Sequence, residues 1–135
     1  MRNREGGTAM IEMIITLPVL LLLLFGIIEF SILFSRLQTV TNAAREGARS
    51  AVVFRLACNA ATVQGEVRDT VQAYAASGGV TVSASDISVT GACSGANNNT
   101  TVQVVSNYAF RIVGGFAPGL APSIDVTGTS VMRNE

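Results

Sequence analysis

Apolar residues are concentrated near the start of the chain, in a run from Met13 to Phe34. The residues that interrupt this run are Thr16, Pro18, Gly26, Glu29 and Ser31. As a helix, its 22 residues would measure about 33 Å, which matches the ~30 Å hydrocarbon core of a bilayer. No second run of this kind occurs in the sequence. The pattern therefore predicts one transmembrane helix.

Small and apolar residues continue at helical spacing beyond the run, through Leu37, Val40, Ala44, Ala48 and Ala51. We therefore expect one long helix over residues 8–57, transmembrane in its first half and amphipathic in its second. On this helix Ala43, Gly47 and Ala51 are small residues four apart, a spacing that lets another backbone approach closely. This face would cover the chain's own sheet, which we favour, or contact a neighbouring subunit.

The remainder, residues 58–135, is expected to form a small exported domain. Val63, Val67, Val71 and Tyr74 recur at helical spacing and predict a second helix over 59–76, with Asn59 or Thr62 as its cap and Gly78 and Gly79 at its end. Alternating apolar residues predict strands over 80–84, 87–89, 102–112 and 124–131, with loops over 92–99 and 114–123. These elements define an α+β fold, in which a helix packs on one face of a mainly antiparallel sheet.

Two cysteines, Cys58 and Cys93, fall at the end of the long helix and in the loop after the 87–89 strand. We predict that they form a disulfide, which requires an oxidising compartment such as the periplasm. The alternative is two unrelated free thiols, because spacing alone does not establish pairing.

Composition argues against most enzymes. The chain has no His, which removes Ser-His and Cys-His nucleophile pairs and His-ligated zinc, and two Cys are too few for a four-cysteine zinc site. The exported acids considered for acid catalysis are Glu66, Asp69, Asp86 and Asp125. Glu66 and Asp69 lie three apart beside Arg68, the spacing of a solvated helix face. We expect no enzymatic activity, metal or cofactor.

Charge placement predicts how the helix sits in the membrane. Arg2 and Arg4 precede the apolar run, and the positive-inside rule places this end in the cytoplasm and the rest of the chain outside. The formal net charge is zero, so no nucleic-acid partner is expected.

Two carboxylates, Glu12 and Glu29, stand out because an acidic residue in an apolar helix is costly in lipid unless it is solvated or paired. Glu12 either has a functional role or sits at headgroup depth beside the helix N-terminus. Glu29 lies about 25 Å further along the helix, near the outer interface. It would pair with Arg36 or with a neighbouring subunit.

The N-terminal third resembles the TadE-like pseudopilins of the tight-adherence (Tad, Flp pilus) machinery. The resemblance rests on a short basic leader ending in Gly7, on Glu12, on Leu17-Pro18, and on the run to Gly26-Ile27-Ile28-Glu29-Phe30. It continues through the string Asn42-Ala43-Ala44-Arg45-Glu46-Gly47-Ala48-Arg49, and Met13 departs from the aromatic residue usual in the family. The ending Ser130-Val131-Met132-Arg133 also looks like the family's tail.

The resemblance implies a type IV pilin-like subunit with a leader over residues 1–7. A prepilin peptidase would cut after Gly7, so that Thr8 becomes the N-terminus and the carboxylate of Glu12 pairs with the new ammonium of an adjacent subunit. Pro18 removes one helix hydrogen bond and should bend or loosen the helix, which assembly could use.

The function implied is that of a minor pilin or pseudopilin in pilus assembly or priming. Its partners would be prepilin peptidase, other pilins and pseudopilins, the inner-membrane assembly platform and the lipid bilayer. Its location would be the bacterial inner membrane, with the C-terminal domain in the periplasm. The main alternative is an uncleaved, membrane-anchored periplasmic scaffold or binding protein. A secretory signal peptide cut near Ala43 or Ala44 is disfavoured, because the apolar run exceeds the ~7 to 15 residues of such segments.

Overall fold

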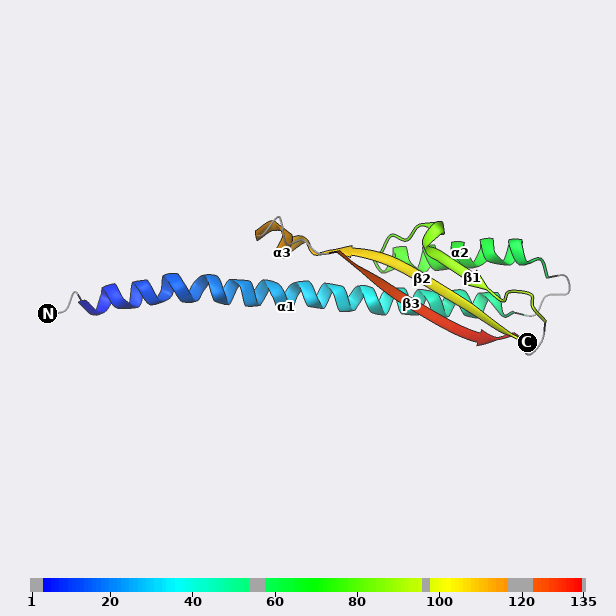
Figure 1. Cartoon of the computed structure of the whole chain (residues 1–135), viewed down its shortest axis with the longest axis horizontal. Coiled ribbons are helices and arrows are strands. Elements are labelled where there is room, and N and C mark those ends of the chain that lie inside the picture. Colours follow the sequence, from blue (N-terminus) through cyan, green and yellow to red (C-terminus); the bar gives the residue numbers. More distant parts are fainter. Residues whose placement is uncertain (1–3, 54–57, 96–97, 117–122, 135) are drawn as a thin grey trace. The chain divides into compact units, whose positions relative to one another are not determined.

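A computed structural model describes residues 4–53, 58–95, 98–116 and 123–134 (Figure 1). Its elements are the helices α1 (Arg4–Ala51), α2 (Ala60–Ser77) and α3 (Arg111–Phe116), a short 3-10 turn (Ala84–Asp86), and the strands β1 (Ile87–Thr90), β2 (Asn99–Ala109) and β3 (Ser123–Arg133). A long apolar helix, a shorter helix and a three-stranded antiparallel sheet confirm the predicted α+β class.

The long helix α1 is continuous from Arg4 to Ala51, so it starts before Thr8. Its apolar part contains few polar side chains, and two of them are satisfied within the helix. The hydroxyl of Thr16 donates to the carbonyl oxygen of Glu12 at 2.7 Å, and that of Ser31 donates to Ile27 at 2.8 Å. Such bonds to the preceding turn leave little unmet polarity in the apolar run.

The chain divides into two units, Met1–Ile32 with Ala109–Pro122, and Leu33–Tyr108 with Ser123–Glu135. The first unit contains the apolar part of α1 and the short helix α3. The second unit contains the rest of α1, helix α2 and the sheet, and it holds most of the buried core.

In the second unit, one face of α1 packs against α2 and the sheet. Val40, Ala43, Ala44, Ala48 and Ala51 are buried on this face, as is Gly47. A Cβ added at Gly47 would lie 2.5 Å from Cγ2 of Val71 on α2 and 3.4 Å from Cγ1 of Val102 on β2. The small residues thus set the close approach of these three elements.

Helix α2 forms as the sequence predicts. The side chain of Asn59 caps it, with Oδ1 accepting from the backbone N–H of Ala61 at 3.0 Å. Of its predicted apolar positions, Val63, Val67 and Val71 are buried, whereas Tyr74 is 39% exposed and the neighbouring Ala75 is buried instead. Gly78 follows its last residue and lies so close to α1 that an added Cβ would be 2.5 Å from Cγ2 of Thr39.

The sheet has the order β1-β2-β3, and β1 pairs antiparallel with β2 with Ile87 opposite Val104 and Val89 opposite Val102. All four of these side chains are buried, which confirms the alternation in the sequence. The predicted strands over 87–89 and 124–131 are present as β1 and β3.

The strand expected over 80–84 is not formed. Val80 and Val82 are buried, as their alternation suggests, but the backbone bonds to α2 instead of to a neighbouring strand. The N–H of Val80 donates to Ala75 at 2.9 Å, and Nε2 of Gln72 donates to the carbonyl oxygen of Val82 at 3.0 Å. Alternating burial therefore occurs here without a sheet ladder.

The strand expected over 102–112 ends early, at Ala109, and the chain turns into α3 at Arg111. Ile112 therefore lies on a helix. A loop is predicted over 114–123. In the structure, residues 114–116 belong to α3 and Ser123 begins β3, while residues 117–122 lie outside the described residues.

A buried polar cluster joins the end of the chain to the turn before β2. Thr100 is fully buried, and its hydroxyl donates to Oδ1 of Asn134. Nδ2 of Asn134 donates to the carbonyl oxygen of Gly91 at 3.1 Å, and its backbone N–H donates to Asn98 at 2.8 Å. The cluster thus satisfies polar groups that burial would otherwise leave unpaired.

We expect Asn134→Ala to lower the free energy of unfolding by about 1 to 2 kcal/mol, because it removes the side-chain bonds of Asn134 to the buried Thr100 hydroxyl and to the Gly91 carbonyl oxygen, which leaves Gly91 as the remaining acceptor of that hydroxyl. Urea unfolding of the full chain in detergent measures this. Asn107→Ala is the matched control, since Asn107 bonds Asp125 at an exposed position where water can replace the bond. Equal losses in the two variants would contradict a role for burial.

Candidate membrane and assembly surface

The apolar part of α1 exposes its side chains along its length. Met10, Ile14 and Leu22 are each about two thirds exposed or more. Among the described residues, α1 is the one helix long and apolar enough to cross a membrane. The first part of α1 therefore has the composition, length and exposure of a membrane span.

The predicted cleavage junction, Gly7–Thr8, lies in the second turn of α1. A Cβ added at Gly7 would meet no atom within 4 Å, so packing does not require glycine there. Each glycine in a helix costs roughly 1 kcal/mol relative to alanine. Gly6 and Gly7 together therefore make this turn easier to unwind than the helix that follows.

The two carboxylates of the apolar helix lie in different environments. Glu12 is exposed, and its backbone carbonyl accepts the Thr16 hydroxyl. Glu29 is buried, with 2% of its surface exposed. Its Oε1 accepts from the N–H of Arg111 and its Oε2 accepts from the N–H of Ile112, each at 2.8 Å.

Glu29 therefore caps the N-terminus of α3 from 82 residues away in the sequence. The first amides of a helix lack partners within the helix, and a carboxylate that accepts from them is also favoured by the helix dipole. The sequence predicts that Glu29 pairs with Arg36 or with another subunit, and contains no local signal for this contact. Arg36 lies over the ring of Tyr108, with its guanidinium carbon 4.9 Å from the centroid.

Pro18 lies inside α1, which remains helical through it. Because proline has no N–H, the carbonyl oxygen of Ile14 lacks its usual donor at this turn.

The small residues predicted for helix packing, Ala43, Gly47 and Ala51, are buried in the chain's own second unit. Of the two alternatives left open by the sequence, packing within the chain is the one that the structure shows for this face. The methyl groups of Val67 and Val71 on α2 occupy the space beside Gly47.

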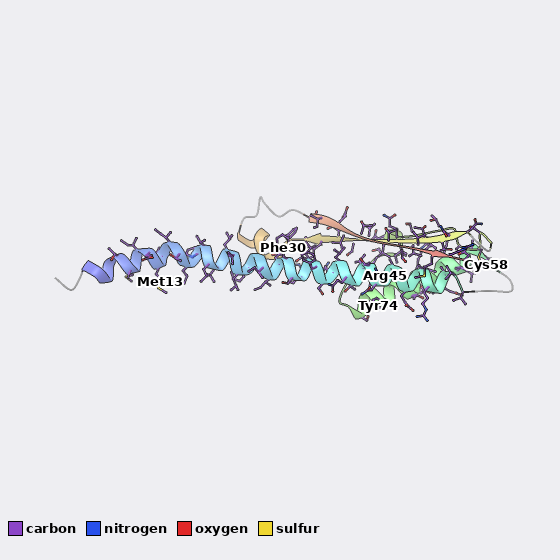
Figure 2. All side chains as sticks on the ribbon, turned by 90° about the horizontal axis from the view of Figure 1, so that it is seen from below. Met13, Phe30, Arg45, Cys58 and Tyr74 are labelled. Atoms are coloured by element: carbon purple, nitrogen blue, oxygen red, sulfur yellow. A yellow bond between two sulfur atoms is a disulfide. The ribbon has the colours of Figure 1, made fainter. Side chains whose placement is uncertain are left out.

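The string over 42–49 divides between two faces of α1. Ala43, Ala44, Gly47 and Ala48 point into the core, whereas Asn42, Arg45 and Arg49 are exposed and Glu46 is half-buried. Figure 2 shows Arg45 on this part of α1. The exposed residues follow a spacing of three and four, so they form a polar stripe along the helix. Packing of the core accounts for the small residues but not for this stripe.

Cys58 and Cys93 form a disulfide, with their Cα atoms 5.6 Å apart. The bond confirms the predicted pairing. It connects the segment before α2 with the turn that leads to β2.

Two of the acids considered for catalysis, Asp86 and Asp125, accept hydrogen bonds from nearby residues. Oδ2 of Asp86 accepts from the N–H of Ser83 at 3.3 Å, and Oδ1 of Asp125 accepts from Nδ2 of Asn107 at 2.8 Å. Within the part of the chain that the structure describes, no group of three or more His, Cys, Asp or Glu side chains is arranged to hold a metal ion.

The arrangement indicates a protein with one helix long and apolar enough to span a membrane, followed by a small α+β domain. Residues 7–49 match the family model described as TadE-like protein, which confirms the resemblance over this segment. The match includes the Gly7–Thr8 junction, both carboxylates of the apolar helix and the polar stripe. Neither the curated proteins nor the solved structures contain a match to the chain.

Proposed function

We propose that the chain is a non-enzymatic, prepilin-like subunit that takes part in assembly or priming of a Tad-type pilus. The observation that carries this proposal is the TadE-like match, which coincides with the exposed apolar part of α1. The subunit would be anchored in the bacterial inner membrane, with its N-terminus in the cytoplasm and its second unit in the periplasm. Its partners would be prepilin peptidase, other pilins and the assembly platform.

Cleavage after Gly7 would be the first step. To reach the peptidase, the first turns of α1 must unwind, and the two glycines reduce the cost of unwinding. The product would have 128 residues, because seven of 135 are removed.

The second step would be charge pairing between subunits. Cleavage creates an ammonium group at Thr8, and Glu12 offers an exposed carboxylate one helical turn away. Two opposite charges brought together in an apolar bundle are tolerated as a pair, whereas either alone is costly. The pair would set the register between neighbouring apolar helices.

The polar stripe of Asn42, Arg45 and Arg49 would supply a further contact outside the membrane. Its side chains are exposed, and the opposite face of α1 is already covered by the chain's own domain. Arginine suits this role because its guanidinium binds carboxylates in a bidentate manner.

Intact mass tests the proposal directly. The chain is expressed in cells with and without a prepilin peptidase, and is extracted from their membranes. We expect a mass that begins at Thr8 when the peptidase is present and at Met1 when it is absent. A chain that begins at Met1 in both would support the uncleaved anchor.

Glu12→Gln tests the pairing step. We expect it to leave cleavage intact and to reduce co-purification with other pilins about tenfold or more, since one buried charge loses its partner. Asp69→Asn is the matched control, because Asp69 is an exposed acid on α2. Unchanged co-purification of the Glu12→Gln variant would refute the pairing.

A further inference from the structure

In the turn of α1 around Glu29, the charged side chain is buried and the apolar side chains are exposed. The one charged side chain is 2% exposed, whereas its apolar neighbours Ile28 and Phe30 are 41% and 58% exposed, and Ile32 is 42% exposed. A surface in water would show the opposite arrangement. This pattern is the one expected where a helix faces lipid and its polar groups must be satisfied internally.

The length of the apolar run gives a second reason. Between Glu12 and Glu29 there are 16 residues, which measure about 24 Å as a helix, less than the ~30 Å hydrocarbon core. The run without further charge extends to Ser35, since Arg36 is the next charged residue. A span of sufficient length therefore places Glu29 inside the bilayer, near its outer boundary.

Helix α3 makes that position tolerable for a carboxylate. Both oxygens of Glu29 accept backbone amides of α3, and those amides in turn gain the acceptors that lipid could not supply. The sequence of α3 is Arg-Ile-Val-Gly-Gly-Phe, in which Arg111 is exposed and is the one charged residue. An arginine beside short apolar sequence is typical of segments at the headgroup layer.

We infer that α3 is an interfacial helix that inserts into the outer leaflet of the membrane crossed by α1, and that Glu29 holds it at this depth. The partner of this surface is lipid of that leaflet, because α3 is apolar in sequence apart from Arg111, which would lie toward the phosphates. The inference rests on the proposed membrane span. It assigns Glu29 a role within the chain, distinct from pairing between subunits.

Tryptophan reporters test the depth, because the chain contains no tryptophan. Three glycines accept one, since an added Cβ would meet no atom within 4 Å at Gly26 in the apolar run, Gly115 in α3 or Gly65 in α2. Each full-length variant is reconstituted into vesicles of phosphatidylethanolamine and phosphatidylglycerol, with or without phosphatidylcholine spin-labelled close to the headgroup. Quenching by the spin label reports that the tryptophan lies near the headgroup region of the bilayer.

We expect Gly115→Trp to be quenched at least half as strongly as Gly26→Trp, and Gly65→Trp to be quenched negligibly. If Gly26→Trp is quenched and Gly115→Trp behaves like Gly65→Trp, α3 lies in water or against protein, and the inference fails alone. If Gly26→Trp is quenched neither by this label nor by phosphatidylcholine spin-labelled deep in its acyl chain, α1 does not enter the bilayer, and the proposed function fails with it.

Variants of Glu29 test what holds α3 in place. The Glu29 changes are made separately in the Gly115→Trp and Gly26→Trp variants. Glu29→Gln loses one of the two acceptors and Glu29→Ala loses both. We expect quenching at position 115 to be lower in Glu29→Gln than in the parent variant, and lower still in Glu29→Ala. Quenching at position 26 should be retained in both. Asp69→Asn, at an exposed acid on α2, is the control and should change neither. Quenching at position 115 that persists in Glu29→Ala would refute the holding role.

Discussion

Replacing Gly47 by leucine is expected to destabilise the second unit by about 3 kcal/mol. The first added carbon would already lie 2.5 Å from Cγ2 of Val71 and 3.3 Å from Cγ1 of Val67. Both valines are stiff, buried side chains on α2, so the helices must separate to accommodate a larger residue. Urea unfolding of the full chain in detergent, followed by circular dichroism, measures the loss.

Gly65→Leu is the control for this substitution. Gly65 also lies in a helix, but an added Cβ there would meet no atom within 4 Å. We expect this variant to be as stable as the wild type or more stable by up to ~1 kcal/mol, because glycine is a poor helix former. Similar destabilisation of both variants would show that the close packing of α1 on α2 is not the cause.

Opening the disulfide is expected to have a comparable effect. The bond closes a loop with a sequence separation of 35 residues, for which chain entropy gives a stabilisation of roughly 3 to 4 kcal/mol. This is a large fraction of the stability of a small domain. Cys58→Ser and Cys93→Ser should each lower the free energy of unfolding by this amount.

The double variant separates a bond from two independent thiols. Because each single change breaks the same bond, the double variant should be no less stable than either single variant. Reducing agent should lower the stability of the wild type to the same level and leave all three variants unaffected. Additive losses, or a wild type that resists a reductant able to open the bond, would contradict a stabilising disulfide.

The string over 42–49 has two parts, small residues and exposed polar residues, that are expected to act in different ways. Its small residues are buried by the chain's own α2 and β2, so their substitution should act through folding. Its exposed arginines, Arg45 and Arg49, contribute little to that packing. Loss of assembly in variants of the stripe that fold normally would therefore point to a partner contact.

The sequence by itself determined the elements whose signal is local. The apolar run of α1, the cap of α2 at Asn59 and the alternation of β1 each depend on residues close together in the chain. With two cysteines there was one possible intramolecular pair, and the structure contains it.

Where a local sequence signal is compatible with more than one structure, only the tertiary structure decided between them. Val80 and Val82 alternate like a strand, yet their backbone bonds to α2, because alternation reports which side is buried and not what the amides contact. The small face of α1 had two possible partners, the chain's own domain, which the sequence favours, and another subunit. The positions of Val67 and Val71 show the first.

Helix α3 and the role of Glu29 were beyond the sequence for the same physical reason. The first turn of α3 contains no acidic residue of its own, and its acceptor comes from a residue 82 positions earlier. A helix six residues long is not stable alone, so its formation depends on that distant carboxylate. The fold brings the two together, so that the carboxylate of Glu29 accepts hydrogen bonds from α3 and α3 gains its N-terminal cap.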